Sequence, residues 1–280
     1  FQPLFIIELG ASKEILGILL MLQSVTAIIF QLPGGVLADR IGRKKVMVYC
    51  SLIRCIPPLI YAAANNWVLL IPAIIIDSSS LLDMPASVAL TLESLPSENR
   101  GAGYGVFNTL TMLPRIFTMP VGGFLMDLLG VIPGMRVCFI INEAVLLLVA
   151  FLLWKFVSET RSEAEPQKAK IAETKRMDLF LTEKLKLMPK NAWFLVLVGG
   201  IISFATNLSM SYMVVYAVGV IGLSNTEWGI IGTVFSLLST VLTTPTGFLA
   251  DRVGRKSCIA ASHLLVLVSA FGFISSRDFA

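Results

Sequence analysis

Long apolar stretches separated by short polar turns constrain this chain more than any other feature. A bilayer core of about 30 Å is crossed by about 20 helical residues. Inside a bilayer every segment must satisfy its own backbone hydrogen bonds, so the stretches predict membrane-spanning helices, the first being only a helix tail. They lie near residues 1–9, 13–38, 46–64, 67–93, 101–128, 133–156, 191–219, 225–250 and 257–275.

The composition excludes a water-soluble globule. Hydrophobic residues make up 56% of the chain and charged residues 14%, with a mean hydropathy of +0.82. A soluble domain has about a quarter charged residues. The only histidine and the four cysteines show no metal or redox spacing, so we expect no metal, cofactor or disulfide framework. No P-loop or nucleophile–base pair is visible, so we expect neither an enzyme nor an ATP-driven pump.

Lysine and arginine are distributed unevenly between the two sides of the predicted membrane. If the loop after the second stretch is cytoplasmic, 17 of the 22 basic residues lie on that side. Three bases lie on the other side and two, Arg54 and Arg115, lie within stretches. The positive-inside rule therefore predicts a multi-pass protein of the cytoplasmic membrane, surrounded by the lipid bilayer, with that loop facing the cytoplasm.

The segment from Gly10 to Lys45 recurs 212 residues later, with 14 of its 36 positions identical and no gap. Such internal symmetry is typical of transporters built from two related halves, with the substrate site between them. We therefore predict an N-terminal helix bundle over residues 1–157, a cytoplasmic linker over 158–190 and the start of a second bundle over 191–280. Extending the repeat predicts about twelve helices, with about twenty residues before this chain and about ninety after it.

The linker allows two interpretations. Apolar residues recur in it at helical spacing, which is typical of an amphipathic helix on the membrane surface. A flexible polar linker explains the same composition, so both remain open. The apolar residues are Met177, Leu181, Leu185 and Met188.

A charged loop ends each repeated segment, as "GGVLADRIGRKK" and as "TGFLADRVGRKS". This pattern resembles the signature of the major facilitator superfamily of prokaryotic type, and "PSENRGAGYG" before the fifth stretch is also similar to that family. The first copy comprises Gly35, Asp39, Arg40, Gly42, Arg43 and Lys44. The second copy comprises Gly247, Asp251, Arg252, Gly254, Arg255 and Lys256.

The resemblance implies an all-helical membrane fold with two pseudo-symmetric six-helix bundles, of which about nine helices lie in this chain. It also implies that the loop latches the two halves in the outward-facing state. The residue types fit that role, because Gly35 permits close helix approach and Asp39 can meet a helix N-terminus or a base. Gly42 permits a tight turn, and Arg43 and Lys44 suit the cytoplasmic surface. The alternative is a topology signal alone, and binding of nucleic acid is not expected between two membrane spans.

Five ionisable residues lie inside predicted spans, where charge is costly and marks functional candidates. They are Arg54, Asp77, Asp83, Arg115 and Glu143. At 1.5 Å per residue, Arg54 and Asp83 lie at about 12 and 15 Å from the cytoplasmic end, and Arg115 and Asp77 at about 21 and 24 Å. The depths predict two pairs, Arg54 with Asp83 and Arg115 with Asp77.

Asp77 begins a polar block, "DSSS", in the middle of the fourth stretch. The resemblance implies that the fourth and seventh helices line a central cavity. Asn207, Ser211 and Tyr212 would then face Asp77, and Glu8 could join them. The alternative is structural, with serines bonding across helices and a paired Asp77 setting the packing.

Two departures from family patterns bear on coupling. Proton-coupled members often carry an arginine early in the fourth helix, near Ala73 here, and many antiporters carry G-P-x-x-G-G in the fifth, where "MPVGG" is one residue short. We expect a monomeric secondary active transporter that moves a small polar solute or drug by alternating access, coupled to protons, with an efflux permease as one form. The alternatives are an uncoupled facilitator and a transporter-like receptor.

Overall fold

The computed structural model of the chain describes residues 1–95, 100–157 and 189–254, and single positions between 257 and 272. The regular structure of these residues is helical, and none of them forms a strand, which confirms the predicted all-helical class. The predicted linker helix with Met177, Leu181, Leu185 and Met188 lies outside the described residues. So does most of the predicted stretch near 257–275.

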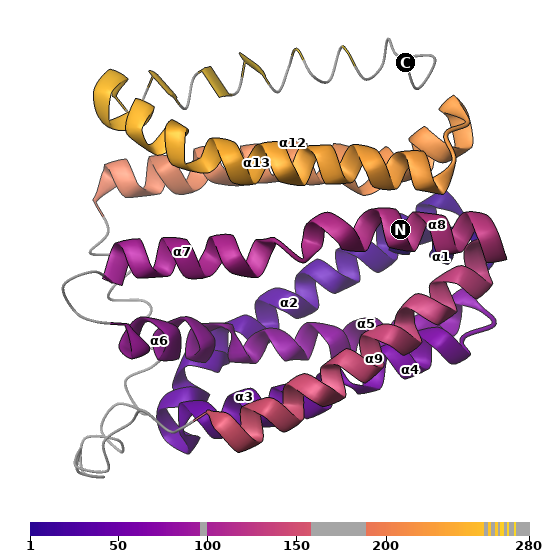
Figure 1. The fold of residues 1–280 in the computed structure, drawn as a ribbon, viewed down its shortest axis with the longest axis horizontal. Coiled ribbons are helices and arrows are strands. Elements are labelled where there is room, and N and C mark those ends of the chain that lie inside the picture. The colour runs from indigo at the N-terminus through magenta and orange to yellow at the C-terminus, as the bar shows by residue number, and fades with distance from the viewer. Residues whose placement is uncertain are drawn as a thin grey trace.

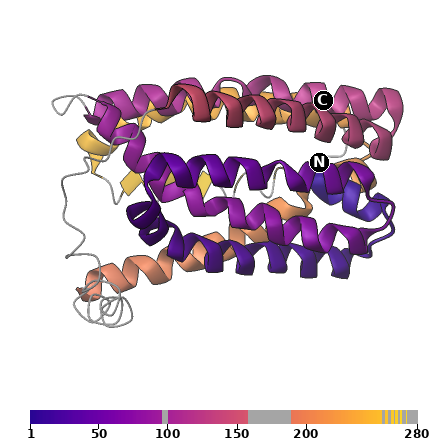
Figure 2. The same ribbon diagram turned by 90° about the horizontal axis from the view of Figure 1, so that it is seen from below.

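The helices run side by side along the long axis of the molecule (Figures 1 and 2). In the view of Figure 1, α12 and α13 lie along one edge and α3 and α9 along the other. The elements before residue 158 are α1 (Gln2–Glu8), α2 (Lys13–Ile41), α3 (Arg43–Arg54), α4 (Ile56–Ala63), η1 (Trp67–Leu69), α5 (Leu70–Ser79), η2 (Ser80–Asp83), α6 (Met84–Ser94), α7 (Arg100–Met112), α8 (Arg115–Leu129) and α9 (Val131–Phe156). The elements after residue 188 include α12 (Lys190–Tyr216), η4 (Ala217–Ile221) and α13 (Asn225–Val253).

Six helical segments of the described part are long and apolar enough to cross a membrane. These segments are Lys13–Gln31, Arg43–Ala63, Trp67–Ser94, Gly103–Leu129, Val131–Phe156 and Ala192–Ile221. Many large apolar side chains point outward, such as Phe204 at 72% and Phe117 at 69% exposed. A water-soluble protein rarely exposes apolar surface so extensively, whereas lipid tails solvate it at no cost.

The buried core joins elements that precede residue 158. Phe5 of α1, Leu16 of α2 and Leu70 of α5 are fully buried in it. The Phe139 ring of α9 stacks on Tyr61 of α4 at 5.0 Å and meets Phe5 edge-on at 5.4 Å between centroids. These aromatic contacts hold α1, α4 and α9 together at one end of the bundle.

The sequence repeat is also a repeat of local structure. Helices α2 and α13 are each 29 residues long, and both ends of α13 lie 212 positions after those of α2. The glycines before the helices, Gly10 and Gly222, have φ of +90° and +85°. The glycines after them, Gly42 and Gly254, have φ of +104° and +95°. Only glycine adopts such values without strain, so each copy needs it at both positions.

Three of the predicted spans are interrupted rather than continuous. The stretch at 46–64 breaks at Cys55, the stretch at 67–93 tightens into the 3₁₀ turn η2, and the stretch at 101–128 breaks before α8. A proline lies at or beside each interruption: Pro57, Pro85 and Pro114. Proline lacks the backbone N–H and clashes with the preceding turn, so it breaks a helix unless neighbours satisfy the freed carbonyls.

Candidate functional site

The interruption of the fourth span creates a binding position for Arg54. In η2 the N–H of Met84 donates to the carbonyl oxygen of Leu81. A regular α-helix would use the carbonyl of Ser80 instead, so the tighter turn frees that acceptor. The Nη2 atom of Arg54 donates to the Ser80 oxygen at 3.0 Å and to Oδ1 of Asp83 at 3.1 Å. The predicted pairing of Arg54 with Asp83 is thus confirmed, and the arginine also satisfies the broken helix.

Helix α2 packs closely against this turn. A Cβ atom at Gly34 would collide with the carbonyl of Leu82, so only glycine permits the approach. About two turns earlier in α2, Thr26 Oγ1 donates to Ser78 Oγ at 2.8 Å, and Ser78 Oγ in turn donates to the Ile74 oxygen at 2.8 Å. Ser78 therefore bonds across helices, as the structural interpretation of the polar block predicts.

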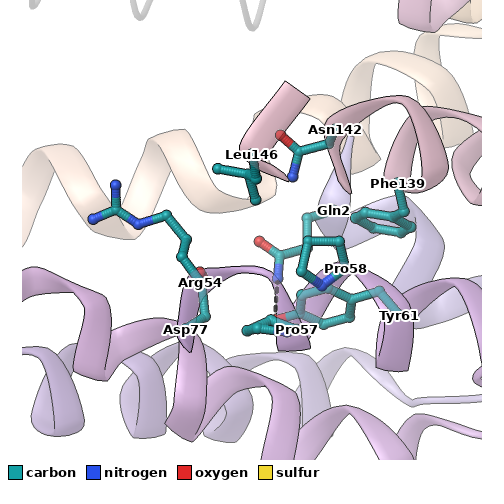
Figure 3. A pocket seen from close by; sticks show the side chains of 9 residues that line it. All are labelled: Gln2, Arg54, Pro57, Pro58, Tyr61, Asp77, Phe139, Asn142 and Leu146. Carbon is teal, nitrogen blue, oxygen red and sulfur yellow. Dashed lines mark hydrogen bonds between the residues drawn. The ribbon is translucent and has the colours of Figure 1, made fainter. Parts of the chain in front are cut away.

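Asp77 faces a pocket that Arg54 also lines (Figure 3). The pocket has a volume of about 230 Å³ and lies between α1, α3, α4, α5 and α9. Polar and aromatic groups surround it, and the Nε2 atom of Gln2 donates to the Tyr61 hydroxyl at 3.3 Å. The lining residues are Gln2, Arg54, Pro57, Pro58, Tyr61, Asp77, Phe139, Asn142 and Leu146. One guanidinium and one carboxylate in a partly apolar pocket can bind a solute with both polar and apolar parts.

Glu143 of α9 is buried at 8% exposure, deep in the same part of the bundle. Its Oε2 atom has no hydrogen-bond partner among the described residues. A buried polar atom without a partner is costly, so this carboxyl group stays a candidate for a role in transport.

The predicted partners of Asp77 lie elsewhere. Asn207 is exposed and its Nδ2 donates to the Ser203 oxygen of its own helix at 2.8 Å. The Tyr212 hydroxyl donates to the Lys13 oxygen at 3.2 Å, at the start of α2. Neither these residues nor Ser211 and Glu8 line the pocket around Asp77. The expected grouping is therefore not found here. Asn207, Ser211 and Tyr212 lie on α12, which does not line this pocket, and α1 contributes Gln2 rather than Glu8.

The side chain of Arg115 lies outside what the structure describes, so its predicted pairing with Asp77 stays a prediction. Asp77 instead shares its pocket with Arg54. Sequence reasoning also missed Gln2, Tyr61 and Asn142. In the sequence these three residues stand out only as polar or aromatic residues within apolar stretches. Such residues are too common in membrane helices to identify a site.

The first charged loop is helical rather than an open loop: α2 continues through it to Ile41, the chain turns at Gly42, and α3 begins at Arg43. Arg43, the first residue of α3, forms an ion pair with Glu93 near the end of α6. Sequence reasoning missed Glu93, although an acid ending the fourth stretch on the predicted cytoplasmic side was a usable signal. Lys44 is half-buried. Other predicted loop residues have side chains or positions outside the described part: Gly35, Asp39, Arg40, Gly247, Asp251, Arg252, Arg255 and Lys256.

Comparison with known proteins gives a consistent family. The model of the Major Facilitator Superfamily matches residues 1–279. The chain is 26% identical over 173 residues to the multi-drug resistance efflux pump PmrA of Streptococcus pneumoniae, covering 60% of this chain and 42% of that protein. It is 23% identical over 241 residues to the quinolone resistance protein NorA of Staphylococcus aureus, covering 84% of this chain and 59% of that protein.

The chain spans about half the length of the curated relatives that it matches. The family model covers nearly all of the chain, and the helices, the membrane-spanning lengths and the repeated segment all agree with it. The chain belongs to the major facilitator superfamily.

Proposed function

We propose that the protein is a proton-coupled secondary transporter that exports small organic solutes from the cytoplasm by alternating access. The observation that carries this proposal is the pocket that Asp77 and Arg54 both line, beside the interrupted fourth span. Discontinuous helices near the middle of the membrane commonly form the substrate and ion sites of transporters.

Asp77 is proposed as the coupling carboxylate. Arg54 already holds Asp83 at 3.1 Å, whereas Asp77 opens to the pocket, where a solute or a proton can reach it. A proton that neutralises Asp77 lowers the cost of a conformation that hides the group from water, so proton binding shifts the conformational equilibrium. A cationic or polar substrate group would compete with that proton for the same carboxylate.

The substrate class follows from the size and chemistry of the pocket. Pockets for drug-sized ligands usually have volumes of about 300–1,000 Å³, and the volume here is about 230 Å³. This size favours a small solute with an apolar part against Phe139 and Tyr61 and polar groups against Asp77 and Arg54. Export is proposed because one relative is named an efflux pump and another a resistance protein.

The first charged loop is proposed to latch the cytoplasmic end. The ion pair of Arg43 with Glu93 ties the start of α3 to the end of α6, and so fixes the turn at Gly42 that follows the helix end carrying Asp39. The second copy, at Gly247–Lys256, is proposed to act in the same way in its half of the molecule.

The test is transport by the full-length protein in liposomes. With an imposed proton gradient, the unchanged protein should concentrate a fluorescent organic solute, and Asp77→Asn should abolish concentration while retaining exchange across equal concentrations. Ser79→Ala is the matched control, because among the described residues the Ser79 hydroxyl bonds to the Ile76 oxygen of its own helix, at 2.6 Å. If Asp77→Asn still concentrates the solute, Asp77 is not the coupling group. If the unchanged protein only equilibrates the solute, the protein is an uncoupled facilitator.

A further inference from the structure

The pattern of the charged loops occurs a third time, in the fifth span. "GGFLMDLLG" at 122–130 matches "GGVLADRIG" at 34–42 in both leading glycines, the leucine, the aspartate and the final glycine. The local structure matches as well. Gly42 and Gly130 have φ of +104° and +91°, and each is the N-cap of the following helix. In this pattern Asp127 takes the place that Asp39 has in the first copy.

The third copy lies at the opposite end of the molecule from the first. Helix α8 ends where α13 begins, and α2 starts at that same end, where Lys13 contacts Tyr212 of α12 (Figure 1). The first copy forms the other end of α2 and the turn after it. The third copy also lacks the basic run, because "VIP" follows Gly130 whereas "RKK" follows Gly42. The positive-inside rule predicts this difference between an extracellular and a cytoplasmic turn.

Asp127 binds the first turn of α13 with both carboxylate oxygens. Its Oδ1 atom accepts hydrogen bonds from the backbone N–H of Asn225 at 3.0 Å and from Asn225 Nδ2 at 2.8 Å. Its Oδ2 atom accepts from the backbone N–H of Thr226 at 2.8 Å and from Thr226 Oγ1 at 2.6 Å. A carboxylate at a helix N-terminus gains from charge-assisted hydrogen bonds and from the helix dipole together.

The backbones of α8 and α13 touch below this contact. A Cβ at Gly123 would collide with the Asn225 backbone, and one at Gly229 would come within 2.7 Å of the Met119 oxygen. Further along, the Thr233 hydroxyl donates to the Ile116 oxygen at 2.8 Å. Asp127 therefore closes the end of a tightly packed contact between α8 and α13, which joins the parts of the chain before and after residues 158–188.

Helix α13 has a cap of its own, and Asp127 of α8 adds to it by accepting from the N–H groups of Asn225 and Thr226. Ser224 and Glu227 form a complete capping box, in which the Glu227 N–H donates to Ser224 Oγ at 3.1 Å and the Ser224 N–H donates to Glu227 Oε2 at 2.8 Å. The four bonds of Asp127 are made between two helices and are lost together when these separate. Such an all-or-none contact suits an element with two discrete arrangements.

We propose that Asp127 is a positioning residue for alternating access, which latches α8 to α13 and holds the predicted extracellular end closed. It is the counterpart, at that end, of Asp39 in the cytoplasmic loop, and the proposal rests on the transport function proposed above. Opening to the outside requires all four bonds to break, so Asp127 sets the balance between the two conformations without touching the solute.

The test measures distances in the full-length protein in liposomes, with its native cysteines replaced by alanine. Spin labels at Phe124 on α8 and Val220 on η4 report opening at this end, since both side chains are exposed, at 58% and 65%. Asp127→Ala should raise the ratio of long to short label distances about tenfold, because it removes several charge-assisted bonds. Ser224→Ala is the matched control, since it weakens the cap of α13 but leaves the contact with α8. The control should leave the distances unchanged.

Two outcomes overturn the proposal: unchanged distances in Asp127→Ala, or an equal shift in Ser224→Ala. If Asp127→Ala does not fold, Asp127→Asn and Thr226→Val replace it, because each removes part of the same contact. Both should shift the distances in the same direction, and the double variant should shift them less than the sum of the two. The distances need neither a substrate nor a proton gradient, so this result is independent of whether Asp77→Asn abolishes coupling.

Discussion

At the scale of single residues, Arg54 connects the fold to the proposed site. Its guanidinium holds the carbonyl of Ser80 and the carboxylate of Asp83, and its side chain also lines the pocket with Asp77. Arg54 thus both stabilises the interrupted span and supplies the positive charge that lines the pocket.

Arg54→Gln should destabilise the protein. The change leaves Asp83, with a side chain 12% exposed, without its charged partner. Because the arginine side chain is itself 35% exposed, we expect a loss of about 2 kcal/mol, less than for a fully buried pair. A thermal melt of the detergent-solubilised protein measures it. The double variant Arg54→Gln with Asp83→Asn should recover part of the loss, and an unchanged melting temperature in the single variant would show that the ion pair contributes nothing.

The depth of residues along a helix could be predicted from the sequence, but their direction around it could not. Depth follows from the rise per residue, and it correctly paired Arg54 with Asp83. Rotation depends on how neighbouring helices pack, which no single span records. For that reason Gln2 and Asn142 were not recognised as neighbours of Asp77.

At the scale of helices, the spans were predictable as long apolar stretches, whereas their interruptions were not. Proline is often tolerated in membrane helices, so the prolines within the predicted spans did not show where a helix would be interrupted. Whether a proline bends a helix or ends it depends on which neighbour takes up the freed carbonyl. At η2 that neighbour is Arg54, on another span. The interruption is therefore a property of two helices together.

The contact between α3 and α6 gives a prediction at this scale. The ion pair of Arg43 with Glu93 joins the two helices at the end that carries the first charged loop. Glu93→Lys places two bases together there, so it should weaken the closed cytoplasmic end and slow turnover several-fold, with little effect on solute affinity. Transport rates in liposomes measured over a range of solute concentrations separate the two effects.

The matched control for that contact is the charge swap, in which Arg43→Glu is combined with Glu93→Lys. The swap should restore part of the turnover rate, because opposite charges again face each other. An unchanged rate in Glu93→Lys alone would remove the ion pair from the latch. A lowered affinity with an unchanged rate would place its effect on the solute site.

At the scale of the whole molecule, the duplication explains most of the architecture. The repeat of 212 residues was visible in the sequence because the charged loop and its glycines need particular residues. The third copy was harder to find, because it keeps only the glycines, the leucine and Asp127 and lacks the bases. The turns at Gly42 and Gly254 are followed by basic residues and lie at one end of the molecule. The turn at Gly130 has no basic run after it and lies at the other end.

The most direct measurement of the central claim is ligand binding to the full-length protein in detergent at two pH values. Candidate organic solutes are compared by thermal melting of the unchanged protein and of Asp77→Asn. A ligand at a hundred times its dissociation constant should stabilise the unchanged protein by about 2.7 kcal/mol. The account predicts that acid weakens this stabilisation in the unchanged protein, because a proton competes for Asp77, and that Asp77→Asn removes the pH dependence. Equal stabilisation of both proteins, with the same response to pH, would contradict the assignment of the proton and solute site to Asp77.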